Sequence, residues 1–228
     1  MWKELESSPV NARVAPFIIF LGLTWLQNHF GEAGRYWIYA AKTGVGAWML
    51  WQLRGAIAEM RWAFSWEAVG VGVAVFVMWV GLDDWLKALG CDSGFHRQKN
   101  TDPPWNPNTA FGAGSVMAWF FVAVRIAGSS LVVPPLEEVF YRSFLYRFIR
   151  KGDFLSVPIG QFVWFPFLAG SALFSVSHHE WLAALLCGCA FQGLAIWKDR
   201  IGDAMTAHAI TNFLLGLWIV WKNDWKFW

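Results

Sequence analysis

The stretch SSLVVPPLEEVFYRSFLY (residues 129–146) decides the class of this chain, because it places charged side chains inside an apolar segment. Glu137 and Glu138 are adjacent, and Arg142 follows the second of them by four residues. An ionised side chain near the centre of a bilayer costs roughly 2.5–3.5 kcal/mol even on insertion scales. Ionisable groups that a membrane helix keeps against that cost usually face the bundle interior and take part in chemistry or transport.

The composition of the whole chain is typical of a membrane protein. Hydrophobic residues make up 57% of the 228 residues and charged residues only 15%. The 18 tryptophans fit the same class, because Trp favours the interface between bilayer and water. The net charge of +2 and the lack of a dense Lys/Arg block argue against nucleic acid as a partner.

The apolar segments predict an all-α fold, a polytopic integral membrane helix bundle. A spanning helix needs about 20 mostly apolar residues. The candidate spans are 14–30, 36–53, 66–82, 111–127, 129–149, 159–177, 181–197 and 202–221. This gives about eight transmembrane helices, with seven as the alternative.

The alternative arises in the stretch 111–149. We prefer two helices separated at Gly128-Ser129-Ser130 over one long helix kinked at Pro134-Pro135. Proline in a membrane helix frees backbone carbonyls that neighbouring groups must satisfy, so a structural break is expected directly before the glutamates. Residues 83–110, which are rich in Asp and Pro, are predicted to form a polar surface loop.

The first polar group in these helices is the carboxylate pair with its arginine. Glu138 and Arg142 are i,i+4 neighbours on a helix and can form an ion pair. Glu137 is rotated by about 100° from Glu138, so it is left for another task. A desolvated carboxylate suits a general base near neutral pH. The alternative is an ion pair that only clamps two helices together.

Two further polar groups lie in later apolar segments. Phe174 and His178 share a helix face, and His179 follows directly. His208 and Asn212 are also i,i+4 neighbours and present donors on one face. Each pattern alone is compatible with a structural role, because His and Asn form interhelical hydrogen bonds in membranes. Together with the carboxylates they favour activation of water by a carboxylate, with His and Asn donors stabilising an oxyanion.

The order and spacing of these motifs resemble the membrane-embedded CAAX protease and bacteriocin-processing family, also called the ABI or Rce1-like family. Its motifs Glu-Glu-x-x-x-Arg, Phe-x-x-x-His and His-x-x-x-Asn stand here as Glu137-Glu138…Arg142, Phe174…His178 and His208…Asn212. The resemblance covers about residues 129–215. One departure is Ser143, because a Gly often follows the arginine in the family.

The resemblance implies an α-helical intramembrane endopeptidase with a defined set of catalytic residues. Glu137 would activate the water with help from His178, and His208 and Asn212 would form the oxyanion hole. Glu138 and Arg142 would shape the site. His179 is a second candidate for the role of His178.

The resemblance does not firmly imply a cofactor. A metal-free glutamate mechanism and a zinc-dependent one both stay open, since two Glu and two His suffice to hold zinc. The zinc ligands would be Glu137, His178 and His208.

The chain, 1–228, is expected to be a single membrane domain. Residues 1–110 would form N-terminal helices without motifs, and 111–228 the catalytic helix core. The expected substrate is a membrane protein or a lipidated peptide, and the expected location is the bilayer of a bacterial cell (inner) membrane, crossed several times. The competing hypothesis is a non-enzymatic membrane protein, either a proton-coupled transporter or a bacteriocin immunity-type factor, with the carboxylates as proton carriers. A transporter would favour inverted repeats, and the sequence has none that we detect.

Overall fold

The computed structural model describes residues 7–27, 29–88 and 104–228, and the regular elements in these ranges are all helical. The predicted all-α class is therefore confirmed. The helices form two compact units. The first unit comprises Met1–Ala58, Asp102–Glu137 and Asn212–Trp228, and the second comprises Glu59–Thr101 and Glu138–Thr211.

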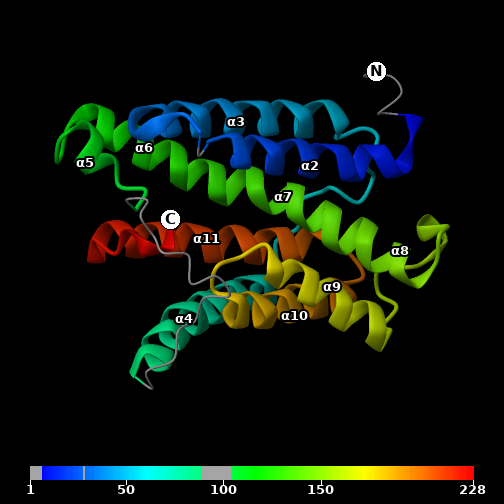
Figure 1. Cartoon of the computed structure of the whole chain (residues 1–228). Helices are drawn as coiled ribbons and strands as arrows, with labels where there is room; N and C mark the ends of the chain where they lie inside the picture. The colour runs from blue at the N-terminus through cyan, green and yellow to red at the C-terminus, as the bar shows by residue number, and fades with distance from the viewer. Residues whose placement is uncertain (1–6, 28, 89–103) are drawn as a thin grey trace. The chain divides into compact units, whose positions relative to one another are not determined.

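The first unit is built on two long helices, α2 (Pro9–Gln27) and α3 (Gly31–Leu53), which lie side by side in Figure 1. Helix α6 (Val116–Ala127) packs along α3. A small residue permits this approach, since a Cβ on Gly128 would lie 2.8 Å from Oγ1 of Thr43 on α3. The unit also contains α5 (Pro107–Phe111), η4 (Trp225–Phe227) and the C-terminal part of α11 (Gly202–Lys222).

The second unit pairs α9 (Trp164–Val176) with α10 (Trp181–Lys198), and α4 (Trp66–Ala88) packs against α10 (Figure 1). Gly188 on α10 allows the α9–α10 contact, because a Cβ there would lie 3.1 Å from Cα of Ser171. The first part of α11 lies against α4, where Thr211 Oγ1 donates to the Gly72 carbonyl at 2.9 Å. The unit also contains η2 (Val139–Leu145), α8 (Tyr146–Arg150) and η3 (Phe154–Ser156).

Residues 116–150 form one continuous helical run, so the predicted separation at Gly128-Ser129-Ser130 is wrong. These residues begin a π-helical turn, η1 (Gly128–Val132), which leads into α7 (Val133–Glu138). The physical reason lies in Pro134 and Pro135. A proline ring clashes with the carbonyl four residues earlier and has no N–H, and a wider π turn before the prolines relieves that clash. The helix therefore continues where the sequence suggested a break.

The predicted loop at 83–110 is partly wrong as well. Helix α4 continues to Ala88, and the short helix α5 occupies Pro107–Phe111. Asn106 caps α5 by accepting a hydrogen bond from the Asn108 backbone N–H at 3.0 Å. The part of the prediction that concerns 89–103 lies outside the described residues.

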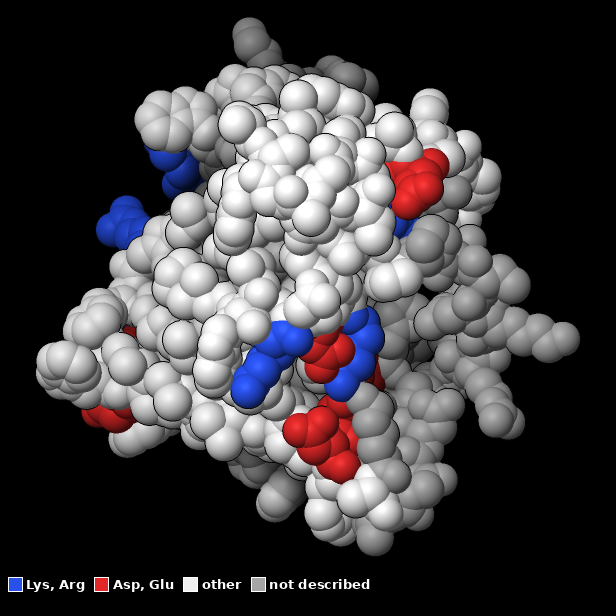
Figure 2. Space-filling model, turned by 90° about the vertical axis from the view of Figure 1, so that its left-hand side faces the viewer, with Lys and Arg blue, Asp and Glu red and all other residues white. Residues whose placement is uncertain are grey.

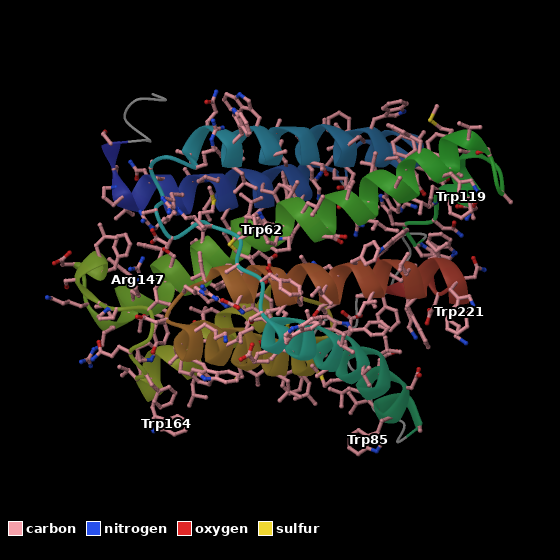
Figure 3. The ribbon with its side chains drawn as sticks, turned by 180° about the vertical axis from the view of Figure 1, so that it is seen from behind. Trp62, Trp85, Trp119, Arg147, Trp164 and Trp221 are labelled. Carbon is pink, nitrogen blue, oxygen red and sulfur yellow. The ribbon has the colours of Figure 1, made fainter. Side chains whose placement is uncertain are left out.

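Five of the described helical segments are long and apolar enough to cross a membrane: Pro9–Gln27, Trp66–Leu86, Val116–Arg150, Trp181–Lys198 and Gly202–Lys222. Helix α9 is apolar but shorter. Figure 3 labels Trp85, Trp119, Trp164 and Trp221, which lie near helix ends and are 54–72% exposed. On the face in Figure 2, charged side chains are sparse. Exposed apolar helices with Trp near their ends are what contact with lipid requires, in agreement with a polytopic membrane helix bundle.

Candidate functional site

The centre of the candidate site is a buried ion network in the second unit. Glu138 ends α7, has no exposed surface and lies between two cationic or ionisable partners. Its Oε2 is 3.0 Å from Nε of Arg142, and its Oε1 is 2.9 Å from Nδ1 of His208. Arg142 is 1% exposed and His208 4% exposed. The network therefore joins the first and third motifs at a place from which water is excluded.

The pairing of Glu138 with Arg142 was predictable, and its surroundings explain why the arginine is tolerated. Both residues sit one turn apart on the run that passes from α7 into η2. The guanidinium carbon lies 4.6 Å from the centre of the Phe174 ring, so the cation is also stabilised by a π face. Both terminal nitrogens of Arg142 are buried, and neither has a hydrogen-bond acceptor among the described residues.

His208 is held on two sides. A carboxylate oxygen cannot donate, so Nδ1 of His208 carries the proton that Glu138 accepts. The imidazole ring stacks on Phe191 of α10, with centroids 5.0 Å apart and planes 26° apart. Phe191 is itself fully buried. These contacts fix both the tautomer and the orientation of the ring.

The second motif lies at the end of α9. The helix ends at Val176 and His178 follows its C-cap Ser177, so the histidine lies just beyond α9, as it lies just beyond the predicted span 159–177. Its Nδ1 is 2.9 Å from the Phe174 carbonyl, which can only accept. Nδ1 therefore carries the proton, and in the neutral ring the lone pair is on Nε2.

Phe174 links the second motif to the other two. Its ring centre is 4.5 Å from that of His178 and 6.3 Å from that of His208, and it also faces Arg142. His178 is half-buried and packs on this ring, whereas His179 is exposed. The geometry thus favours His178 over His179. The second unit brings together Glu138, Arg142, Phe174, His178, Phe191 and His208.

Glu137 and Asn212 belong to the first unit. Glu137 precedes Glu138 on α7 and is half-buried. The side-chain N–H of Asn212 donates to the carbonyl of Ser129 at 2.8 Å. In the π turn, Val133 bonds five residues back to Gly128, and the matching donor for Ser129 would be Pro134, which has no N–H. Asn212 therefore supplies the donor that the proline removes, as expected for a carbonyl freed in a membrane helix.

A second polar cluster, around Glu59, was not predicted from the sequence. Glu59 lies between α3 and α4, and its Oε1 accepts from the hydroxyl of Ser143 at 2.5 Å and from Nη2 of Arg147 at 2.6 Å. Arg147, labelled in Figure 3, is 5% exposed. Ser143 therefore has a local function at the position where the family often has Gly. No sequence signal links Glu59 to residues more than 80 positions away.

The donor set does not assemble a metal site. Among residues 7–27, 29–88 and 104–228, no three His, Cys, Asp or Glu side chains are grouped closely enough to hold a metal ion. We therefore derive no chemical step through zinc. The zinc alternative, with Glu137, His178 and His208 as ligands, is left to the chelator experiment below.

Comparison with known proteins agrees with the motifs. Residues 118–214 match the family model "Type II CAAX prenyl endopeptidase Rce1-like". Searches of curated proteins and of solved structures found no match to the chain. The family is one of membrane proteases, which supports peptidase activity in an integral membrane protein. The resemblance drawn from the three motifs is thus confirmed, since residues 118–214 match the Rce1-like family of CAAX proteases.

Proposed function

We propose that the chain is an intramembrane endopeptidase of the CAAX-protease type that hydrolyses a peptide bond with carboxylate-activated water. The observation that carries the proposal is the buried network of Glu138, Arg142 and His208 within an Rce1-like segment. A fully buried carboxylate is costly unless it is paired and hydrogen-bonded. A histidine held in one tautomer by such a network is suited to proton chemistry.

The two glutamates have different proposed roles. Glu138 is committed to Arg142 and His208 through both of its oxygens, so it is a positioning residue. The general-base role then falls to Glu137, the neighbouring carboxylate on the same helix. This assignment agrees with the role that the family motif implies.

The two histidines also have different proposed roles. In the neutral ring of His178 the lone pair is on Nε2, which suits a partner of the attacking water. His208 donates Nδ1–H to the Glu138 carboxylate, which leaves Nε2 for a substrate. The oxyanion-hole role that the family motif implies requires a proton on Nε2 as well, and this N–H would donate to the oxyanion together with the second amide N–H of Asn212.

The reaction then runs in two steps. Glu137 takes a proton from water, and the hydroxide adds to the carbonyl carbon of the scissile peptide. The oxyanion is stabilised by N–H donors of His208 and Asn212. The tetrahedral intermediate breaks its C–N bond, and the leaving amine takes the proton from Glu137, which regenerates the carboxylate. The products are a carboxylic acid and an amine, between which one proton then passes to give a carboxylate and an ammonium group, so one water is consumed.

The substrate class that fits is a membrane protein or a lipidated peptide, presented from the bilayer of a bacterial inner membrane. The test uses the full chain in liposomes with an internally quenched peptide that ends in farnesyl-Cys-aliphatic-aliphatic-X. Cleavage is expected with the wild type and with Glu32→Gln, an exposed glutamate of the same unit, and not with Glu137→Gln. Loss of cleavage with a zinc chelator and recovery with added zinc would support the zinc alternative.

A second readout makes no assumption about the substrate. Membranes from cells that express wild type or Glu137→Gln are compared by mass spectrometry of labelled protein termini. New termini that depend on Glu137 support the proposal. If neither assay detects cleavage that depends on Glu137, the chain is not a peptidase of this kind, and the proton-carrier hypothesis takes its place.

A further inference from the structure

Arg125 in the first unit lies in a cage of aromatic rings that has no role in the proposed reaction. Its guanidinium carbon is 4.4 Å from the ring centre of Tyr39, 5.0 Å from that of Trp105 and 6.0 Å from that of Trp228. Tyr39 and Trp105 are buried in one apolar cluster, against which Trp228 packs. The rings come from α3, from the segment before α5 and from the chain end, whereas Arg125 comes from α6, which lies along α3 in Figure 1.

The charges in this cage do not balance. Arg125 makes no side-chain hydrogen bond and no ion pair with any residue of the described chain. Lys42 is 4% exposed, lies 4.8 Å from the centre of the same Tyr39 ring and donates only to the Thr24 hydroxyl, at 2.9 Å. Cation–π contacts are worth only about 0.5–2 kcal/mol each. Buried charges in proteins are normally paired with the opposite charge. Here the buried Lys42 and the half-buried Arg125 lie over one ring, and no described carboxylate pairs with either.

The indole N–H of Trp105 is a second group in this cage that needs an acceptor. Trp105 is 5% exposed, and its buried Nε1–H has no hydrogen-bond acceptor among residues 7–27, 29–88 and 104–228. A buried donor without an acceptor is costly, and this donor belongs to a ring that touches Arg125. Trp105 and the half-buried Arg125 are therefore neighbouring groups that can only donate, and neither has a protein acceptor in the part of the chain that the structure describes. The chemistry that satisfies both is an anion with several oxygens.

We propose that Arg125 and Trp105, with Lys42 nearby, bind a phosphate group, supplied by a phospholipid headgroup or by free phosphate. The guanidinium fork matches phosphate oxygens in pairs, and the ammonium of Lys42 adds positive potential. The ring of Trp228 contacts both Trp105 and Trp225. Trp gathers where headgroups lie, which favours the lipid as the source. The site contains no residue of the three motifs and goes beyond the proposed peptidase function.

The test measures the Tm of the full chain in a neutral detergent during titration with three probes. These are dioctanoyl-phosphatidylglycerol, dioctanoylglycerol, which has the same chains without phosphate, and inorganic phosphate. The phospholipid is expected to raise the wild-type Tm by roughly 5–10 °C near saturation, and dioctanoylglycerol is not. Arg54→Gln is the matched control, because Arg54 also stacks on a tryptophan, Trp51, in the same unit but is exposed.

Two variants make the proposal falsifiable. Arg125→Gln is expected to abolish the phospholipid shift. Trp105→Phe keeps the ring but loses the N–H, and is expected to weaken the apparent Kd by about 5–10-fold; it carries the test if Arg125→Gln does not fold. An equal shift with inorganic phosphate would assign the site to the free ion. An equal shift with dioctanoylglycerol, or a full phospholipid shift in both variants, would overturn the proposal.

Discussion

Glu137 is the residue on which the proposed chemistry depends most directly. Glutamine keeps the shape of the side chain but cannot accept a proton. Glu137→Gln is therefore expected to lower cleavage by roughly 10²–10⁴-fold or more, with circular dichroism and Tm unchanged in detergent. Near wild-type cleavage by the purified variant would show that this carboxylate is structural.

Arg142 is expected to matter more for folding than for chemistry. It is the counter-ion of a carboxylate with no exposed surface, and removal of one member of a buried pair costs about 3–5 kcal/mol because the other charge is stranded. Arg142→Ala should therefore lower the Tm strongly. The double variant Glu138→Gln with Arg142→Met removes both charges and should recover part of that loss, because Gln can still accept from His208.

The comparison of these variants also tests the network itself. If the double variant is no more stable than Arg142→Ala, Glu138 and Arg142 are not energetically coupled. A separate readout is the activity of Glu138→Gln alone, in which His208 loses a charged acceptor. Its kcat should fall with KM little changed, a split that a merely structural role of Glu138 would not cause.

The residues of the site differ in how far the sequence predicts them. Glu138 and Arg142 are one turn apart, so helical spacing alone pairs them. The contact of Glu138 with His208 joins residues 70 positions apart, and no local periodicity encodes it; only the order of the motifs did. Phe191 has no signal at all, because an apolar residue in an apolar helix gives no hint that it stacks on a histidine.

Among the helices, the contact between α4 and α11 sets the position of His208. A Cβ on Gly72 would lie 2.7 Å from the Ala207 carbonyl and 2.9 Å from Ile210. Gly72→Ala is therefore expected to push the two helices apart, at a cost of about 1–3 kcal/mol, and to reduce cleavage. Gly70→Ala on the same helix is the control, because a Cβ there would have no neighbour within 4 Å. Equal Tm values for the two variants would contradict the close packing.

The Glu59 cluster ties the connection between α3 and α4 to the π-helical segment η2. Loss of the hydrogen bond from Ser143 to a carboxylate should cost about 1.5–3 kcal/mol in Ser143→Ala. Glu59→Ala should cost more, because it strands the buried Arg147. Chemical unfolding in mixed micelles measures both free energies. If Ser143→Ala is the more destabilised variant, Glu59 is not the acceptor that organises the cluster.

At this scale the sequence predicted the existence of the helices better than their limits. Hydrophobic length identified the apolar segments, including those that pack as α9 and α10. It could not tell a break from a π turn at Gly128, because both allow the same Gly, Ser and Pro residues. The difference depends on whether another group satisfies the freed carbonyl, and Asn212 lies 83 residues from Ser129.

For the whole molecule, the sidedness of two connections can be tested. The Gly160 N–H donates to Oδ1 of Asp199 at 2.5 Å, so the segment after α8 lies beside the end of α10. In a background without Cys91, Cys187 and Cys189, single cysteines at Gly152 and Lys198 should therefore react with a membrane-impermeant maleimide from the same side. Labelling of the two positions from opposite sides of the membrane would contradict the packing of α9 and α10 as an antiparallel pair.

The π turn at Gly128–Val132 also determines the direction in which each later side chain on the same helix points. Such a turn contains one residue more than an α-turn, and each residue of an α-helix advances the side chains by about 100°. Deletion of a single residue here would leave the composition and hydropathy of the span almost unchanged. It would nevertheless turn both glutamates by about a quarter of a circle relative to α6. Homologous chains should therefore tolerate substitutions in this turn far more readily than a change in its length.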